Sequence, residues 1–115
     1  MNTISCSLAD AYVRAVNDGD ADAYVALFHE NALVDDAGRE FRGRDAIRAW
    51  SASDIFAVNV RFEVVDSTER DGDAVLTTIV DGDFDRTGLP DPVVIVHRIT
   101  AENEKIARLT CRLAD

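Results

Sequence analysis

Residues 58–64 read Val-Asn-Val-Arg-Phe-Glu-Val, and this stretch decides the fold class. Apolar and polar residues alternate along it, which is the pattern of a β-strand with one buried and one exposed face. Further alternating or apolar segments follow at 74–80, 93–100 and 105–113. The residues before 57 follow a helical period instead. The chain therefore changes from mostly helix to mostly sheet, which predicts an α+β fold with helices on one face of an antiparallel sheet.

Three helices are expected upstream of this strand. Apolar residues recur at helical spacing over 7–17, and a second helix is expected over about 20–31 with Phe28 on its buried face. A third follows Gly43 and carries Trp50 on its apolar side. Two antiparallel helices joined by a tight turn, followed by a third, are therefore expected to cover the sheet.

Turn residues separate the remaining segments. Ala37-Gly38 is expected to join a short hairpin between 33–36 and 39–42, and four strands after it form a meander. Residues 93–96 are four consecutive apolar residues, so that strand is expected to be covered on both faces. The helices cover one face. We expect a second copy of the chain to cover the outer face, which predicts a homodimer.

Composition limits the class of protein. The chain has 115 residues, which predicts one domain spanning 1–115 with a hydrophobic core of its own. Twelve Lys and Arg against 22 Asp and Glu give a net charge of −10, which repels phosphate backbones and anionic lipid headgroups. Nucleic acid and membrane are therefore not expected as partners.

The cellular location, the source and the state of the cysteines are predicted from short features of the sequence. No apolar run is long enough for a membrane span or a signal peptide, which predicts a cytoplasmic protein. Eleven of the 12 basic residues are Arg, a usage typical of a bacterial source with GC-rich DNA. Cys6 and Cys111 form no C-x-x-C motif, so two reduced thiols are expected rather than a disulfide framework or a zinc site.

One long motif resembles a known family. Residues 12–36 read Y-V-x-A-x-N-x-G-D-x-D-x-x-V-A-L-F-x-x-x-A-x-V-x-D, and residues 43–48 read G-x-x-A-I-R. Both resemble the opening of bacterial ketosteroid isomerases, and 93–98 and 105–109 resemble later parts less closely. The resemblance places the chain in the nuclear transport factor 2-like superfamily, which includes the SnoaL-like polyketide cyclases. It implies a curved, partly mixed sheet wrapped around helices to form a cone with an apolar pocket, often as a dimer.

The resemblance also implies roles for individual residues. Asp36 falls on the general base of the isomerases, and Tyr12 falls on the tyrosine that donates to the oxyanion. The second oxyanion donor of that family is a protonated aspartate, and its position is held by Val96. The tyrosine that supports the first donor falls on Ser51. The base and one donor are therefore retained, while the second donor and its support are not.

The residues themselves support a pocket. In a strand, Asp36 points to the same side as Val34, and burial in an apolar cavity disfavours the charged form of a carboxylate, which suits a general base. The alternative is a hairpin aspartate that caps local amides. Tyr12 lies on a buried helical stripe, either at the pocket or as a core tyrosine with a satisfied hydroxyl. Phe28 and Trp50 are expected to line the pocket, with plain core packing as the alternative.

Other candidate residues depend on strand register. Asp81 gives the pocket a second carboxylate if it shares the pocket face with Ile79, and otherwise keeps a strand end soluble. Val96 is expected to face the pocket, which places His97 on the outer, dimeric surface. His29 is expected at the end of the second helix. Two histidines in such different places predict no metal site, and no cofactor is expected.

Two functions fit these features. The first is a cofactor-free enzyme in which Asp36 abstracts a proton next to the carbonyl of an apolar metabolite, as in an isomerase, a cyclase or a dehydratase, while Tyr12 donates to the developing oxyanion. The second is a binding protein that uses the same cone to hold a hydrophobic ligand without chemistry. The incomplete catalytic set favours the second, and an acid on the apolar side of a strand favours the first.

Overall fold

The structure is a computed structural model that describes residues 3–114, with side chains described over 7–114. The side chain of Cys6, expected to be a reduced thiol, lies outside the described part. Within residues 3–114, no helix combines the length and the apolar character needed to cross a membrane. The elements in chain order are α1 (Thr3–Asn17), α2 (Ala21–Ala26), β1 (Phe28–Asp36), β2 (Arg39–Arg42), α3 (Arg44–Ser51), the π-helical turn η1 (Ala52–Phe56), β3 (Arg61–Arg70), β4 (Asp73–Asp81), β5 (Val93–Glu102) and β6 (Lys105–Leu113).

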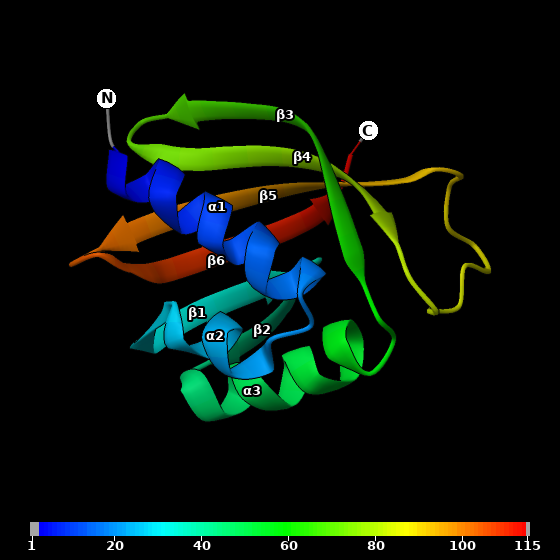
Figure 1. Cartoon of the computed structure of the whole chain (residues 1–115), viewed down its shortest axis with the longest axis horizontal. Coiled ribbons are helices and arrows are strands. Elements are labelled where there is room, and N and C mark those ends of the chain that lie inside the picture. Colours follow the sequence, from blue (N-terminus) through cyan, green and yellow to red (C-terminus); the bar gives the residue numbers. More distant parts are fainter. Residues whose placement is uncertain (1–2, 115) are drawn as a thin grey trace.

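The strands form one six-stranded sheet in the order β2-β1-β6-β5-β4-β3. Strands β3 to β6 form the expected antiparallel meander, whereas β1 pairs with β6 in parallel. Figure 1 shows α1 crossing in front of the meander strands and α2 and α3 lying beside β1 and β2. The mixed, curved sheet with helices on one face confirms the α+β fold predicted from the change of period.

The second helix is shorter than the sequence predicts. It begins after Asp20, whose side chain accepts a hydrogen bond from the Ala23 amide at 3.0 Å, but it ends at Ala26 rather than near residue 31. Phe28 and His29 therefore open β1, so the prediction that they belong to a helix is wrong. The cause is tertiary, since Phe28 pairs with Ile106 of β6, and further along β1 residues 33–36 pair with both β6 and β2.

The core lies between the helices and the inner face of the sheet. Alternate residues of β4 point into it, and Ala74, Leu76, Thr78 and Val80 are all buried. From the helices, Tyr12, Tyr24 and Ile47 are at most 1% exposed. Close packing of one apolar layer against another is the main stabilising contribution in a domain of this size.

The faces of β5 are the reverse of those expected. Val93, His97 and Ile99 are buried on the inner face, with His97 only 1% exposed, whereas Val96 pairs with Thr77 and Arg112 on the outer face. The expectations that Val96 faces the pocket and that His97 faces outward are therefore wrong. Four consecutive apolar residues do not encode which face is which, and a shift of one residue exchanges the two faces.

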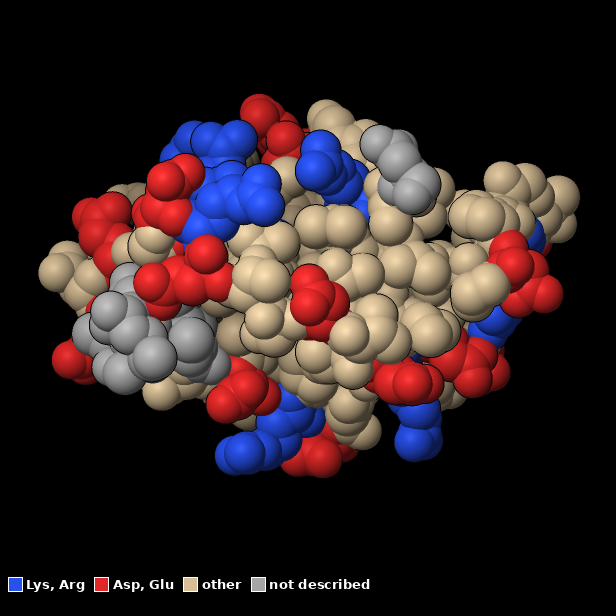
Figure 2. Space-filling view, turned by 90° about the horizontal axis from the view of Figure 1, so that it is seen from above, with Lys and Arg blue, Asp and Glu red and all other residues tan. Residues whose placement is uncertain are grey.

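The outer face of the sheet keeps an apolar character. Val94 and Val96, from the apolar run that motivated a dimer, are half-buried there together with Ile79. Figure 2 shows uncharged side chains over much of the middle of the face seen from above, with an acidic side chain among them and further charged side chains around the margin. The homodimer stays a prediction, now resting on Val94, Val96 and Ile79.

Candidate functional site

A cavity of about 610 Å³ opens between the helices and the inner face of the sheet. Its walls are mostly apolar, with side chains such as Ile55, Val60 and Phe62. Tyr12, Asp36 and Trp50 also line it, so the structure brings these three sequence-predicted residues to one cavity. An apolar cavity with a few polar groups at defined places is the usual form of a small-molecule site.

The sheet register arranges the polar groups in a row. Asp36 of β1 is paired with Cys111 of β6, and Cys111 is paired with His97 of β5. All three residues line the cavity. Two strand spacings separate the backbones of Asp36 and His97, which is roughly 10 Å. The cavity therefore has a carboxylate at one end of the row and an imidazole at the other.

The hairpin between β1 and β2 positions Asp36. Both turn residues, Ala37 and Gly38, have positive φ angles of 53° and 93°, the conformation that a two-residue turn between antiparallel strands requires. Asp35 Oδ1 accepts a hydrogen bond from the Gly38 amide at 2.9 Å, and the Ala37 amide donates to the Cys111 carbonyl at 2.9 Å. Asp36 therefore occupies the last ladder position of β1, tied to β6 at the cavity.

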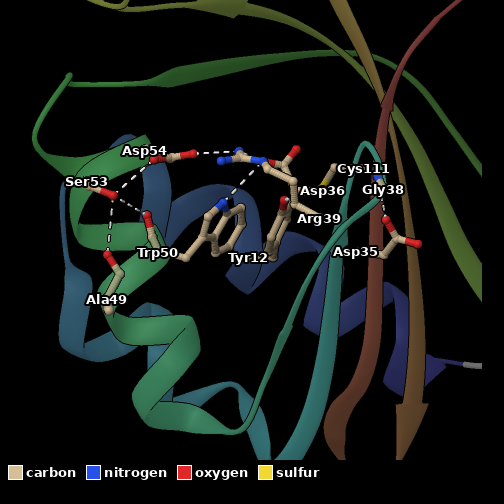
Figure 3. Close-up of polar contacts among 10 residues, drawn as sticks. All are labelled: Tyr12, Asp35, Asp36, Gly38, Arg39, Ala49, Trp50, Ser53, Asp54 and Cys111. Atoms are coloured by element: carbon tan, nitrogen blue, oxygen red, sulfur yellow. Dashed lines mark hydrogen bonds and ion pairs between the residues drawn. The ribbon is translucent and has the colours of Figure 1, made fainter.

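The Asp36 end of the cavity is charged and reached by solvent. Asp36 Oδ2 accepts hydrogen bonds from Arg39 Nη2 at 2.5 Å and from Trp50 Nε1 at 3.1 Å, and its side chain is 25% exposed. Arg39 also donates to Asp54 Oδ2 at 2.8 Å. Figure 3 shows the Arg39 guanidinium lying between the carboxylates of Asp36 and Asp54. The carboxylate was expected in apolar surroundings, and it lies instead at a partly open, ion-paired rim.

The π-helical turn η1 supplies the far side of this rim. It continues α3 after Ser51 and carries Asp54 and Ile55, both on the cavity wall. Hydrogen bonds to Asp54 and to Asp36 raise the pKa of Arg39. Single π-helical turns widen a helix locally and occur often at functional sites. Here the turn places a second carboxylate across the guanidinium from Asp36.

The opposite end of the row is buried and uncharged. Tyr12 Oη lies 2.9 Å from His97 Nδ1, and Thr78 Oγ1 lies 2.8 Å from His97 Nε2. Burial lowers the pKa of His97 to about 3, so the ring is neutral at ordinary pH. Burial, with smaller contributions from Cys111 and Tyr24, raises the pKa of Tyr12 well above its ordinary value. These groups therefore act as hydrogen-bond donors and acceptors without carrying charge.

Cys111 and Tyr24 complete the surroundings of Tyr12. Cys111 Sγ lies 3.8 Å from Tyr12 Oη, and burial raises the pKa of this thiol to about 12. The Tyr24 ring packs 5.6 Å from the Tyr12 ring, and burial raises the pKa of Tyr24 well above its ordinary value. The Tyr24 hydroxyl is buried and has no hydrogen-bond partner in the described part of the chain. Among residues 3–114, no cluster of three or more His, Cys, Asp or Glu side chains is placed to hold a metal ion.

Three of the candidate residues lie away from the cavity. Phe28 is fully buried and packs its ring 5.2 Å from that of Tyr24, which makes it a core residue. Asp81 does share a face with Ile79, but that face is the outer one, and its 78% exposed side chain forms an ion pair with Arg86. Val96 lies on the same outer face. Phe28 was expected at the pocket as part of a helix, and it lies in β1 instead. The expectation for Val96 and the conditional one for Asp81 depended on strand register, which the sequence leaves open.

Several residues at the cavity were not singled out for it from the sequence. His97 was assigned to the outer face, Cys111 was expected only to be a reduced thiol, and Arg39 and Asp54 were not considered. His97 shares its strand face with Val93, Ile95 and Ile99, so assigning that apolar set to the core would have turned His97 inward. Ser51, at the position of the supporting tyrosine, instead donates its hydroxyl to the Arg48 carbonyl at 3.2 Å. His97 is the side chain that contacts the Tyr12 hydroxyl.

The family model of the SnoaL-like domain matches residues 9–109. The chain belongs to the SnoaL-like domain family. No curated protein matches the chain. Among solved structures, a candidate polyketide cyclase from Sinorhizobium meliloti is similar at 27% identity, with a TM-score of 0.81 over 92% of this chain and 94% of that one.

Two further solved structures share the architecture of this SnoaL-like chain. A protein from Sphaerobacter thermophilus is 25% identical, with a TM-score of 0.74 over 96% of each chain. The Δ5-3-ketosteroid isomerase from a Mycobacterium species is 16% identical, with a TM-score of 0.75 over 95% of this chain and 92% of that one. At 16% identity the likeness shows the fold alone. The fold is the one in which isomerases and cyclases occur.

Proposed function

We propose that this SnoaL-like protein is a cofactor-free enzyme that moves a proton on an apolar carbonyl compound, with Asp36 as the base and Tyr12 as the oxyanion donor. The observation that carries the proposal is that both residues line one apolar cavity of about 610 Å³. They come from different elements, Asp36 from β1 and Tyr12 from α1, so only the folded chain brings them to a common space.

The chemistry needs no more than these two groups. An Asp36 carboxylate oxygen takes a proton from the carbon next to the carbonyl, and the electron pair of that C–H bond moves to the carbonyl oxygen as an enolate. The Tyr12 hydroxyl donates a hydrogen bond to that oxygen. The protonated Asp36 then returns the proton to a different carbon, which completes an isomerisation. Since Arg39 and Trp50 both bond to Oδ2, Oδ1 is the oxygen we assign to proton transfer.

The walls and the charge indicate the kind of substrate. The apolar lining matches a substrate with a hydrocarbon body. At the rim, one guanidinium faces two carboxylates, and the whole chain carries a net charge of −10. An anionic substrate is disfavoured by this field. We therefore propose neutral ketones with few polar groups.

The test is turnover of a panel of β,γ-unsaturated ketones and polyketide-like carbonyl compounds. Asp36→Asn removes the base while keeping an acceptor for Arg39 and Trp50, and general-base catalysis is typically worth about 10²–10⁴ in rate. Asp35→Asn is the matched control, because Asp35 caps the hairpin through Oδ1 and is absent from the cavity wall. A loss confined to Asp36→Asn supports the proposal, and equal rates in both variants would contradict it.

The second candidate function is a binding protein for a hydrophobic ligand. It is favoured by the ion pair between Asp36 and Arg39, which engages the carboxylate, and by the outward direction of Val96 at the family's second donor position. Trp50 is the only tryptophan of the chain and lines the cavity, so its fluorescence reports on binding. Saturable binding that survives Asp36→Asn, with no turnover by the wild type on any panel member, would favour this function.

The oligomeric state and the cellular location of the protein are also proposals. We propose a homodimer in the cytoplasm of a bacterium, formed through the outer sheet face that carries Val94, Val96 and Ile79. An apolar face left open to water is typical of an interaction surface. Light scattering at micromolar concentration is expected to give about twice the 12.6 kDa of one chain. A mass of one chain would contradict the dimer.

A further inference from the structure

Three buried polar side chains form a chain of hydrogen bonds at the cavity, where Tyr12 and His97 are part of the lining and Thr78 is not. Thr78 is completely buried, and His97 and Tyr12 are each 1% exposed. The His97 ring lies between them, with Nε2 at 2.8 Å from Thr78 Oγ1 and Nδ1 at 2.9 Å from Tyr12 Oη. A neutral imidazole has one N–H donor and one acceptor nitrogen. The position of its proton therefore decides the direction of every hydrogen bond in the chain.

In one arrangement, Nε2 carries the proton and donates to Thr78 Oγ1, while Tyr12 donates to Nδ1. The hydroxyl proton of Thr78 then needs another acceptor. Within the described part of the chain, the Thr78 hydroxyl has no hydrogen-bond partner except His97 Nε2. This arrangement leaves a donor unsatisfied in the interior, which costs its full desolvation free energy.

In the other arrangement, Thr78 donates to Nε2, and Nδ1 carries the ring proton and donates to Tyr12 Oη. All the buried donors of Thr78 and His97 are then satisfied. In the described part of the chain, the Tyr12 hydroxyl proton is then left with the weakly accepting Cys111 Sγ at 3.8 Å and the neighbouring Tyr24 hydroxyl, which forms no hydrogen bond there. Tyr12 lines the cavity whereas Thr78 does not, so the Tyr12 proton can be accepted by water or a ligand in the cavity, while an unpaired Thr78 proton has no such partner.

We propose that His97 is the Nδ1–H tautomer, fixed by Thr78, and that it is a positioning residue that directs the Tyr12 hydroxyl proton into the cavity. This rests on the proposed function, because it specifies the donor that Tyr12 provides there. The site then selects apolar molecules whose polar group is a hydrogen-bond acceptor, such as a ketone oxygen, over hydrocarbons of the same shape. The ring does not contact the ligand in this account. It holds the phenol oxygen so that only its proton faces the ligand.

The tautomer can be measured without any ligand. The chain has two histidines, so a His29→Gln variant leaves His97 as the only one. Long-range proton–nitrogen correlation spectra of this variant at pH 7 distinguish the protonated ring nitrogen from the bare one. We expect the proton on Nδ1. A proton on Nε2 would overturn the proposal, because Tyr12 would then donate to His97 rather than to a ligand.

The effect on ligand choice is measured by Trp50 fluorescence with two probes of similar shape, 2-acetylnaphthalene and 2-isopropenylnaphthalene, in which a C=CH2 group replaces the C=O group. We expect wild type to prefer the ketone by about 3–10-fold, the range of one neutral hydrogen bond. Tyr12→Phe and His97→Leu are expected to lose this preference. His97→Asn, whose amide can still donate to Tyr12 Oη, is expected to keep most of it.

A ketone preference that persists in His97→Leu but disappears in Tyr12→Phe would overturn the positioning role. Should His97→Leu fail to fold, Thr78→Val gives the same comparison with a nearly isosteric change, and its ketone preference is expected to fall. The experiments distinguish a failure of the proposed function from a failure of this inference. Absence of turnover on every ketone of the panel would remove the enzyme, while an Nδ1 proton and a ketone preference would still support the direction of the Tyr12 hydroxyl.

Discussion

The two ends of the cavity hold their polar groups in different ways. At the rim, Asp36, Arg39 and Asp54 are charged, and the side chain of Arg39 is 59% exposed. At the buried end, Tyr12 and His97 are 1% exposed and neutral. Water screens the first set and is excluded from the second. A single sheet register thus places a carboxylate reached by solvent and a buried neutral imidazole at one cavity.

The largest expected effect is a loss of stability at low pH, which tests whether His97 at the buried end is neutral. The pKa of His97 is about 3 in the folded chain against 6.5 for a free side chain, so the unfolded state binds a proton more readily. Below pH 6.5 this difference favours unfolding, by up to about 5 kcal/mol once the pH reaches 3. At pH 4.5, urea unfolding is expected to show about 3 kcal/mol of this loss.

His97→Asn provides the comparison for this acid effect, because an amide does not titrate. The free energy of unfolding of wild type, relative to His97→Asn, is expected to fall between pH 7 and pH 4.5. His29→Asn is the matched control and is expected to follow wild type. If wild type and His97→Asn lose stability in parallel, the imidazole is not the buried neutral group described above.

A second effect concerns the thiol in the middle of the row. With a pKa of about 12 instead of 9, Cys111 has about 10³-fold less thiolate at pH 8. In a Cys6→Ser background, native protein is expected to react with iodoacetamide at least about 10³ times more slowly than the urea-unfolded chain. Similar reaction rates in the native and unfolded states would contradict this, because they would show that Cys111 is accessible to solvent and forms a thiolate in the folded chain.

Phe substitutions at the two neighbouring tyrosines are expected to change the free energy of unfolding by different and smaller amounts. Tyr24→Phe removes a buried hydroxyl without a partner in the described residues, so we expect unchanged stability or a gain of up to about 1 kcal/mol. Tyr12→Phe leaves the His97 Nδ1 group unpaired and is expected to cost about 1–2 kcal/mol. Chemical denaturation of both variants measures the contrast. A larger loss of stability in Tyr24→Phe than in Tyr12→Phe would contradict this account, because it would mean that the Tyr24 hydroxyl forms the stronger hydrogen bond.

The smallest effect is expected at the rim. Arg39→Gln removes two exposed ion pairs and is expected to lower the free energy of unfolding by less than about 1 kcal/mol. The difference from wild type is expected to vanish in 1 M NaCl, where exposed charges are screened. Urea unfolding at low and high salt measures both. A large loss that salt does not reduce would mean that the rim is as dry as the buried end.

The sequence alone was enough for the parts of the fold that depend on local patterning. The alternation over 58–64 overlaps the first residues of β3, which begins at Arg61. The predicted turns after residue 17 and at residues 37–38 correspond to the end of α1 and to the hairpin that carries Asp36. These features are encoded by neighbours in the chain. Tyr12, Asp36 and Trp50 were predicted at the pocket because helix stripes, one hairpin and a family motif are local as well.

The remaining features depend on contacts between distant segments. Residues 28–31 join a strand because Phe28 pairs with Ile106 of β6, a contact that no local pattern indicates. His97 faces inward because of the register of β5 against β4 and β6, and a one-residue shift would have exposed it. Arg39 and Asp54 meet through the placement of η1 relative to the hairpin. Such pairings arise only when the sheet and helices assemble.

The central claim is that one ligand meets Asp36 and Tyr12 together. A crystal structure with 2-acetylnaphthalene bound tests it most directly. We predict the carbonyl oxygen within about 2.6–3.2 Å of Tyr12 Oη, with the methyl carbon next to the carbonyl directed toward Asp36. A ligand whose carbonyl oxygen instead bonds to Arg39 at the rim, with its ring against Tyr12, would contradict the account.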